Sequence, residues 1–304
     1  MFFRLIEVVA LLLTLGGVSL SSRWVLLLIM GGLGFISACL RVADYSLMPA
    51  LVAQRDLVKA NALIKIASLI GLGLSALMMM LIYKYDVLPA FVCLGAVALS
   101  VISLGLTYLM PEQKSVDPET EVVKNPIHVF DYVGKTLKYK FDDWAYLIGI
   151  AWFWVLMSLV GMLSGEYGQN ILQARWSVMA FLSGAIFPLG YIIGSIICVR
   201  SNRKRLGSQA VWVGALISLV LLDFVFAGSA LSQIEVNKAI TISRLLTGSL
   251  LYWHVLLNVF VLGLLSALYV IPFYAQLQMH TEERIMGRMF SFSGLLNALT
   301  MGCA

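Results

Sequence analysis

Residues 250–277 read LLYWHVLLNVFVLGLLSALYVIPFYAQL, a run of 28 residues without a single Lys, Arg, Asp or Glu. A hydrocarbon core about 30 Å thick is crossed by about 20 mostly apolar residues of helix. The run does not alternate between apolar and polar residues, as a strand of a membrane barrel would. It therefore predicts a membrane-spanning α-helix, in which the backbone hydrogen bonds are satisfied within the segment.

Comparable apolar runs follow one another along the chain, so the sequence predicts an all-α polytopic membrane protein with about nine transmembrane helices. The runs are residues 5–20, 24–50, 60–82, 87–110, 144–163, 176–199, 208–230, 250–277 and 290–304. Arg4 and the first run also fit a signal peptide, but Glu7 within the run and the lack of a cleavage site favour a span. The last run is short and has no flanking charge, which favours a chain cut inside a span.

The composition agrees with a protein of the bilayer. Of the 304 residues, 61% are hydrophobic and 12% are charged, and the mean hydropathy is +0.92. Soluble domains are about a quarter charged, and they need those charges to separate apolar surface patches. The composition therefore argues against a soluble enzyme, a nucleic-acid binder and a secreted disulfide scaffold.

Motifs for catalysis and metal binding are missing from the sequence. The four cysteines show no CxxC spacing and are interpreted as buried thiols. Walker A, Gly-x-Ser-x-Gly and His-Glu-x-x-His patterns are also absent. We therefore expect no enzymatic activity, no ATP-driven transport, no cofactor and no metal.

The distribution of positive charge predicts the orientation in the membrane. Fifteen of the 21 Lys and Arg residues, Lys65 among them, fall on the side of the N-terminus; five fall on the other side, and Arg41 lies at membrane depth. Cytoplasmic loops carry the excess of Lys and Arg in membrane proteins. The N-terminus is therefore expected in the cytoplasm, and this bias also accounts for the net charge of +5 without nucleic acid as a partner.

A long polar connection divides the chain. Residues 111–126, PEQKSVDPETEVVKNP, form a charged linker, and the following residues up to 143 are amphipathic, as expected of a helix on the cytoplasmic surface. The predicted organisation is thus an N-terminal half with four spans (1–110), a cytoplasmic linker (111–143) and a C-terminal half with five spans (144–304).

The two halves resemble each other. The second run ends in YSLMP at 45–49 before a short charged loop, and the eighth contains YVIP at 269–272 before another charged loop. If these runs correspond, the repeat unit is six helices. The chain would then lack about two helices before its start and the end of the second half. Six-helix halves joined by a cytoplasmic linker are the plan of major facilitator transporters.

Three longer blocks and one triplet resemble a particular branch of that superfamily. The blocks are SLMPALVAQRDLVKANALIKIASLIG at 46–71, VMAFLSGAIFPLGYIIGSIICVRSNRKRLG at 178–207 and VIPFYAQLQMHTEERIMGRMFSFSGLLNAL at 270–299; the triplet is Trp152-Phe153-Trp154. They are similar to the lysophospholipid transporter family. The chain departs from that family at 41–45, where RVADY replaces the usual Gly-Pro-Ala-Lys-Tyr.

The resemblance implies a flippase of the bacterial inner membrane. It would return lysophosphatidylethanolamine or lysophosphatidylglycerol to the cytoplasmic leaflet, with membrane lipids and a fused or associated acyltransferase and acyl-carrier-protein synthetase as partners. Two alternatives remain open: a major facilitator efflux carrier for amphipathic drugs or small solutes, and a truncated membrane anchor without transport.

Arg41, Asp44 and the adjacent Tyr45 are candidate substrate contacts. Arg41 and Asp44 are three residues apart and thus share a helix face. A charge at membrane depth costs about 3 kcal/mol, so such groups usually face the bundle and find a partner. Arg41 would contact a phosphate and Asp44 an ammonium group; alternatively, the two form an ion pair with a structural role only.

Further candidates lie in the C-terminal half. Trp152, Trp154, Tyr269 and Phe273 would line a cavity for an acyl chain, or they are packing and interface aromatics. Asp223 and His254 are candidates for proton coupling, or they hydrogen-bond between helices. Arg200, Arg203, Lys204 and Arg205 form a basic segment that resembles a gating loop of the family, or it sets topology and attracts anionic lipid.

Overall fold

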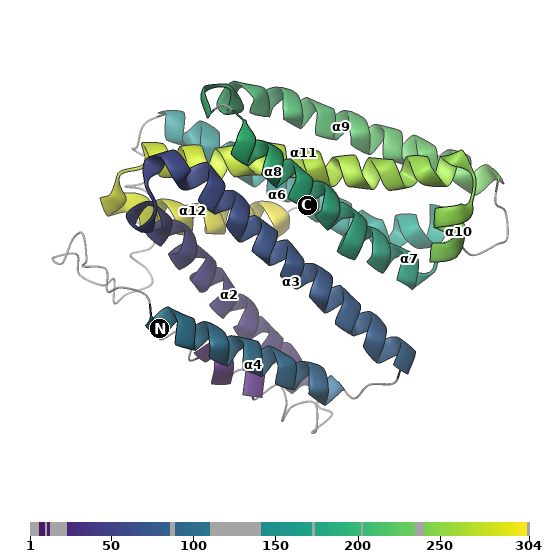
Figure 1. The fold of residues 1–304 in the computed structure, drawn as a ribbon, viewed down its shortest axis with the longest axis horizontal. Helices are drawn as coiled ribbons and strands as arrows, with labels where there is room; N and C mark the ends of the chain where they lie inside the picture. The colour runs from purple at the N-terminus through teal and green to yellow at the C-terminus, as the bar shows by residue number, and fades with distance from the viewer. Residues whose placement is uncertain are drawn as a thin grey trace. The chain divides into compact units, whose positions relative to one another are not determined.

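A computed structural model describes residues 6–9, 11–12, 23–85, 89–109, 141–171, 174–201, 203–234 and 240–302. Its helices are α2 (Arg23–Leu51), η1 (Gln54–Asp56), α3 (Leu57–Tyr85), α4 (Pro89–Tyr108), α6 (Phe141–Glu166), η2 (Tyr167–Ile171), α7 (Trp176–Phe181), η3 (Leu182–Ile186), α8 (Phe187–Arg200), α9 (Arg203–Ile234), α10 (Ile242–Thr247), α11 (Leu250–His280) and α12 (Glu283–Gly302). Figure 1 shows these elements along the chain.

The prediction of an all-α protein is confirmed. No strand forms within the described residues, where one isolated bridge joins Ala174 to Ile240. Within the described residues, each apolar run from residue 24 onward lies almost entirely in helix, because a long continuous apolar sequence without alternation has a helical, not a strand, pattern. Of the first run, residues 6–9 and 11–12 are described, and they are helical.

Five helices among the described residues are long and apolar enough to cross a membrane. These segments are Gln54–Ser75, Trp144–Asn170, Ser177–Arg200, Gln209–Leu231 and Leu250–His280, and a shorter apolar helix covers Leu94–Tyr108. The number of nine spans remains a prediction. The five segments together indicate a membrane-embedded protein, in agreement with the composition.

The chain divides into two compact units that do not follow the sequence order. Unit 1 contains Met1–Ala50, Met78–Lys138 and Glu282–Gly294, and unit 2 contains Leu51–Leu77, Tyr139–Thr281 and Leu295–Ala304. The predicted division at a linker of residues 111–143 stays a prediction, because nearly all of that linker, including most of its amphipathic stretch, lies outside the described residues.

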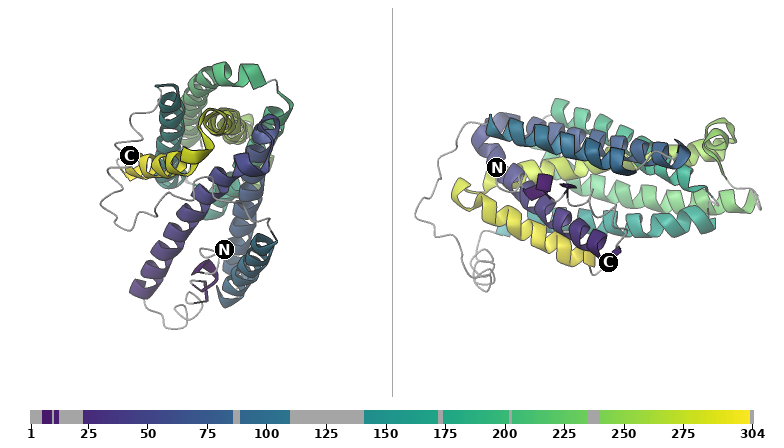
Figure 2. Two further views of the ribbon diagram at one scale, coloured as in Figure 1. Left: turned by 90° about the vertical axis from the view of Figure 1, so that its left-hand side faces the viewer. Right: turned by 90° about the horizontal axis from the view of Figure 1, so that it is seen from below.

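Helix α11 is the core of unit 2. It packs against α6, α8 and α9, and 72% of its apolar window is buried, far more than in the other four candidate spans. Helices α8, α9 and α11 lie together in Figure 1 and remain neighbours in the views of Figure 2. An apolar helix surrounded by other helices explains why the run at 250–277 has no charged face.

Helices α8 and α11 approach each other closely through glycines. A Cβ atom on Gly190 of α8 would collide with the carbonyl group of Phe260 in α11, and a Cβ atom on Gly263 of α11 would collide with the carbonyl group of Phe187 in α8. Small residues at such crossings let two backbones approach, which is how helices associate inside lipid. The crossing fixes the position of α11 against α8.

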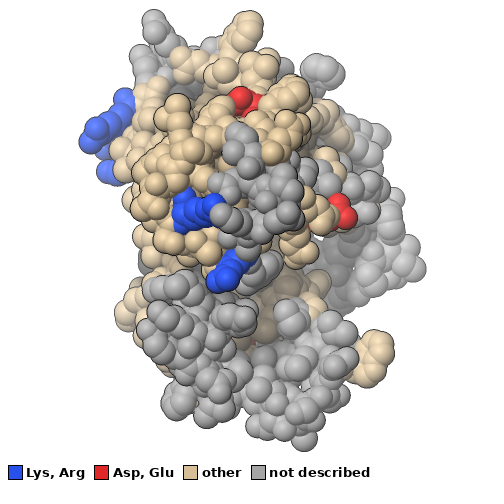
Figure 3. Space-filling view, turned by 90° about the vertical axis from the view of Figure 1, so that its right-hand side faces the viewer, with Lys and Arg blue, Asp and Glu red and all other residues tan. Residues whose placement is uncertain are grey.

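Helix α9 exposes apolar residues where a helix of a soluble protein would expose polar ones. Its outward residues Val211, Trp212, Leu219, Leu222 and Phe226 recur at helical spacing and are exposed, Trp212 to 75% and Phe226 to 71%. Continuous exposed apolar surface is unfavourable in water, so this face is suited to lipid. Figure 3 views the molecule from the right-hand side of Figure 1, and most of the described atoms on that face belong to uncharged residues.

The structure changes the place of one basic residue, Lys65, in the charge count. The charge count places Lys65 on the cytoplasmic side although it falls within the third run, and in the structure it lies inside α3 and inside the candidate span Gln54–Ser75. The count on that side thus falls from fifteen to fourteen, and the excess of positive charge persists. Lys65 becomes an ionisable residue at membrane depth.

Candidate functional site

Four aromatic residues predicted as substrate contacts meet in unit 2. Tyr269 of α11 lies between the rings of Trp152 and Phe273, with centroids 5.7 and 4.8 Å away. Its ring also stacks on Phe153 of α6 at 5.9 Å, and its hydroxyl donates a hydrogen bond to the carbonyl oxygen of Gly149 at 3.2 Å. The α6–α11 contact is therefore an aromatic one.

The fourth aromatic, Trp154, extends this contact toward the end of α11. Its indole Nε1 donates a hydrogen bond to the hydroxyl oxygen of Tyr274, at 3.2 Å. A buried indole or phenol usually has a polar partner of this kind. The hydrogen bond holds the Trp154 and Tyr274 rings next to each other, although they are 120 residues apart in the sequence.

Lys65 of α3 reaches both of these rings. Its Nζ lies 5.0 Å from the centroid of the Tyr274 ring and 5.6 Å from that of Trp154. Both distances are within the reach of a cation–π interaction, which is worth about 2 kcal/mol or more when the groups are desolvated. Three candidate spans thus contribute to one cluster, which we call the Lys65 cluster: Lys65, Trp154 and Tyr274.

A polar contact lies one helical turn from the Lys65 cluster. Asn61 of α3 donates a hydrogen bond from Nδ2 to Oε1 of Gln278 in α11, at 2.5 Å, and a second one to the Leu57 carbonyl oxygen at 2.9 Å. Both side chains are buried, Asn61 to all but 1%. Within the described residues, Oδ1 of Asn61 has no hydrogen-bond partner.

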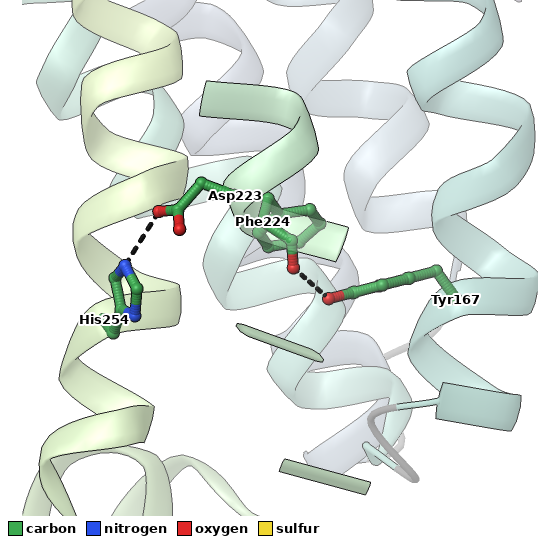
Figure 4. A network of polar contacts seen from close by, with 4 residues as sticks. All are labelled: Tyr167, Asp223, Phe224 and His254. Carbon is green, nitrogen blue, oxygen red and sulfur yellow. Dashed lines mark hydrogen bonds and ion pairs between the residues drawn. The ribbon is translucent and has the colours of Figure 1, made fainter. Parts of the chain in front are cut away.

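Asp223 and His254, the candidates for proton coupling, are in direct contact. Nε2 of His254 in α11 lies 2.8 Å from Oδ2 of Asp223 in α9 (Figure 4). Both residues lie within candidate spans, and both side chains are about half-exposed. A carboxylate that accepts from one ring nitrogen also orients the imidazole and selects its tautomer.

The backbone beside this pair is held by Tyr167. The hydroxyl of Tyr167 donates a hydrogen bond to the carbonyl oxygen of Phe224, the residue after Asp223, at 2.6 Å (Figure 4). The two aromatic rings are 4.7 Å apart. Tyr167 opens the π-helical turn η2, and such turns are frequent at functional sites. The position of Asp223 is therefore fixed by side-chain and backbone contacts alike.

The remaining predicted substrate contacts belong to unit 1. Arg41 and Asp44 lie three residues apart in α2, and both residues are exposed. Tyr45 is buried, and its ring stacks on that of Phe290 in α12 with centroids 5.5 Å apart. Packing against α12 is thus the observed contact of Tyr45, while the roles of Arg41 and Asp44 in substrate binding remain predictions.

The basic segment at 200–205 is divided between two helices. Arg200 is the last residue of α8 and is exposed, and α9 begins at Arg203, so Arg203, Lys204 and Arg205 lie in its first turn. Cations at a helix N-terminus are unfavourable for the helix dipole. Their presence there is consistent with either interpretation of the segment, gating or attraction to anionic lipid.

The sequence identified several of these residues but not Lys65, Asn61, Tyr274, Gln278 or Tyr167. Lys65 was counted with the cytoplasmic charges although it falls within the run 60–82, and the other four carry no signal by themselves. Among the described residues, no three His, Cys, Asp or Glu side chains gather as a metal-ligand set.

Comparisons of the chain with protein-family models, with curated proteins and with solved structures found no match.

Proposed function

We propose that the protein is a secondary carrier of the major facilitator type that moves lysophospholipids across a bacterial inner membrane by alternating access. The observation that carries this proposal is the contact between Asp223 and His254, two ionisable side chains paired across two candidate spans. Ionisable residues inside a membrane are costly, and they usually mark ion pathways, proton relays or substrate sites. A membrane anchor would have no use for such a pair.

The substrate class is supported by two features. The blocks at 46–71, 178–207 and 270–299 resemble the lysophospholipid transporter family. In addition, Trp152, Tyr269 and Phe273 present an aromatic surface where α6 meets α11, and such rings bind apolar chains with their faces and polar groups with their hydroxyls. A single-chain amphiphile needs both kinds of contact.

Uptake of radiolabelled lysophosphatidylethanolamine into proteoliposomes tests this function. We expect saturable uptake above that of protein-free vesicles. The competing function is a carrier for amphipathic drugs. It predicts no uptake of lysophospholipid, and a difference in the accumulation of a lipophilic dye between vesicles with and without the protein. The second pattern would overturn the lysophospholipid assignment and leave a carrier.

The pair of Asp223 and His254 predicts an effect on energy coupling. We expect a protonophore to slow uptake by the unaltered protein, and Asp223→Asn to lower the initial rate about tenfold while removing the sensitivity to the protonophore, because an amide cannot exchange a proton. His254→Gln should have the same effect.

The matched control is Glu282→Gln, which neutralises an exposed acid between α11 and α12, outside the candidate spans, and should leave both the rate and the protonophore response unchanged. Uptake by Asp223→Asn at the normal rate, with the normal response, would reduce the pair to a hydrogen bond between helices, worth about 0.6 kcal/mol.

A further inference from the structure

The Lys65 cluster places a cation well inside the apolar layer. Lys65 is 11 residues from Gln54, Trp154 is 10 residues from Trp144, and Tyr274 is 6 residues from His280, each counted along its own candidate span. At 1.5 Å per residue, the three positions lie about 9 to 16 Å from the span ends. The core is about 30 Å thick, so Lys65, counted from Gln54 along its candidate span, lies about halfway across.

The three span ends used in this count fall on one predicted face of the membrane. Residues 54, 144 and 280 adjoin three of the loops whose Lys and Arg residues were counted on one face, and this is the face predicted to be cytoplasmic. The three span ends thus share one predicted face, and Lys65, near the middle of its candidate span, is the deepest of the three residues.

We propose that the Lys65 cluster binds the phosphate of a lysophospholipid head group, an inference that rests on the proposed function. The aromatic faces of Trp154 and Tyr274 contact the ammonium group of Lys65. A phosphate then replaces the ring faces as its partner, because a charge-assisted hydrogen bond to an oxyanion is stronger than a cation–π contact. The rings remain to contact the glycerol and the first carbons of the acyl chain.

Asn61 supplies the second part of the head-group site. Residues four apart on a helix are neighbours, about 5 to 6 Å between their Cβ atoms, so Asn61 lies next to Lys65 on α3. Its buried Oδ1 has no partner among the described residues, and a buried acceptor gains from a donor. The ammonium of lysophosphatidylethanolamine and the terminal hydroxyls of lysophosphatidylglycerol are donors at a suitable distance from the phosphate.

Ligand binding to the purified 304-residue chain in nanodiscs tests the site. Three single-chain probes of equal chain length are compared: lysophosphatidylglycerol, a free fatty acid and an uncharged monoacylglycerol. For Lys65→Gln we expect lysophosphatidylglycerol affinity to fall about ten- to a hundredfold, the range for the loss of a charged hydrogen bond, while monoacylglycerol binding is unchanged. Lys65→Arg should retain most of the affinity.

The matched control is Lys59→Gln, which removes an exposed cation from the first turn of the same helix and should leave all three affinities unchanged. If Lys65→Gln does not fold, the site can still be tested on the unaltered protein by measuring the reactivity of Lys65. Lysophosphatidylglycerol should slow the acylation of Lys65 by acetic anhydride, followed by mass spectrometry, and should not slow that of Lys59.

The outcomes separate the site from the function. Equal lysophosphatidylglycerol affinity in Lys65→Gln, or no protection of Lys65, overturns the site even if uptake is measured. Binding that depends on Lys65, without any uptake, supports the site and overturns the proposed function. A Lys65-dependent affinity for the fatty acid alone overturns the assignment to phosphate.

Discussion

Replacement of Gly190 by leucine is expected to abolish the folded state of unit 2. A Cβ atom at this position would collide with the carbonyl carbon and oxygen of Phe260 and would approach the amide nitrogen of Leu264. These are backbone atoms of α11, which cannot rotate away as a side chain can, so α8 and α11 would have to separate. The partner glycine, Gly263, makes the reciprocal contact with the carbonyl of Phe187, and separation would lose that contact as well.

The expected destabilisation is about 3 kcal/mol or more, at the upper end for overpacking of a core, and Gly190→Ala should already be destabilising. The measurement is thermal unfolding in detergent, followed by tryptophan fluorescence and by size-exclusion chromatography. The control is Gly161→Ala in α6, where nothing lies within 4 Å of an added Cβ; alanine favours helix over glycine by up to about 1 kcal/mol. A Gly190→Leu protein as stable as the unaltered one would contradict the described crossing.

Replacement of Arg41 by alanine is expected to abolish lysophospholipid uptake. Arg41 is exposed on α2, one turn from Asp44. A guanidinium can bind two phosphate oxygens at once, and Asp44, on the same helix face, would attract the ammonium of an ethanolamine head group. If Arg41 is a substrate contact, its loss removes one cation that the phosphate meets in addition to Lys65. Arg41→Lys should retain part of the rate, because it keeps the charge without the two-pronged geometry.

Uptake in spheroplasts, normalised to the amount of protein in the membrane, checks this result. The matched control is Arg55→Ala in η1. Arg55 is also exposed, and its Nε lies 3.3 Å from the neighbouring Asp56, but an exposed pair of this kind contributes little. Unchanged uptake in Arg41→Ala at normal expression would leave Arg41 and Asp44 with a structural role only.

The helices of the fold were predictable because the apolar pattern is local. Residues 250–277 become helix α11 whatever they pack against, since a segment of this length and composition has to satisfy its own backbone hydrogen bonds in lipid. The partner of each helix was not predictable in this way. Nothing in the sequence near Gly190 or Gly263 indicates which backbone each glycine approaches, because that depends on side chains distant in the chain.

Part of the candidate site was predictable, because an ionisable residue inside a long apolar run is rare and is therefore easily noticed. Asp223 and His254 stood out for that reason, and the structure brings them to 2.8 Å. Trp152, Trp154, Tyr269 and Phe273 were also found, although their individual partners were not. Lys65 lies within the predicted run 60–82 but was counted with the charges of the adjoining loop; Trp154 and Tyr274 are distant from it in the chain, and only the structure brings them to it.

The outward face of α9 has a consequence for handling the protein. Trp212 and Phe226 belong to an exposed apolar surface that is unfavourable in water, so the acyl chains of a lipid or detergent would be suitable neighbours for these side chains. Lipid or detergent molecules would therefore have to cover this face for the protein to stay in solution. If purification removes the lipid faster than detergent replaces it, we expect the molecules to associate through the outward face of α9. This association would come before any contact between helices of the bundle is lost.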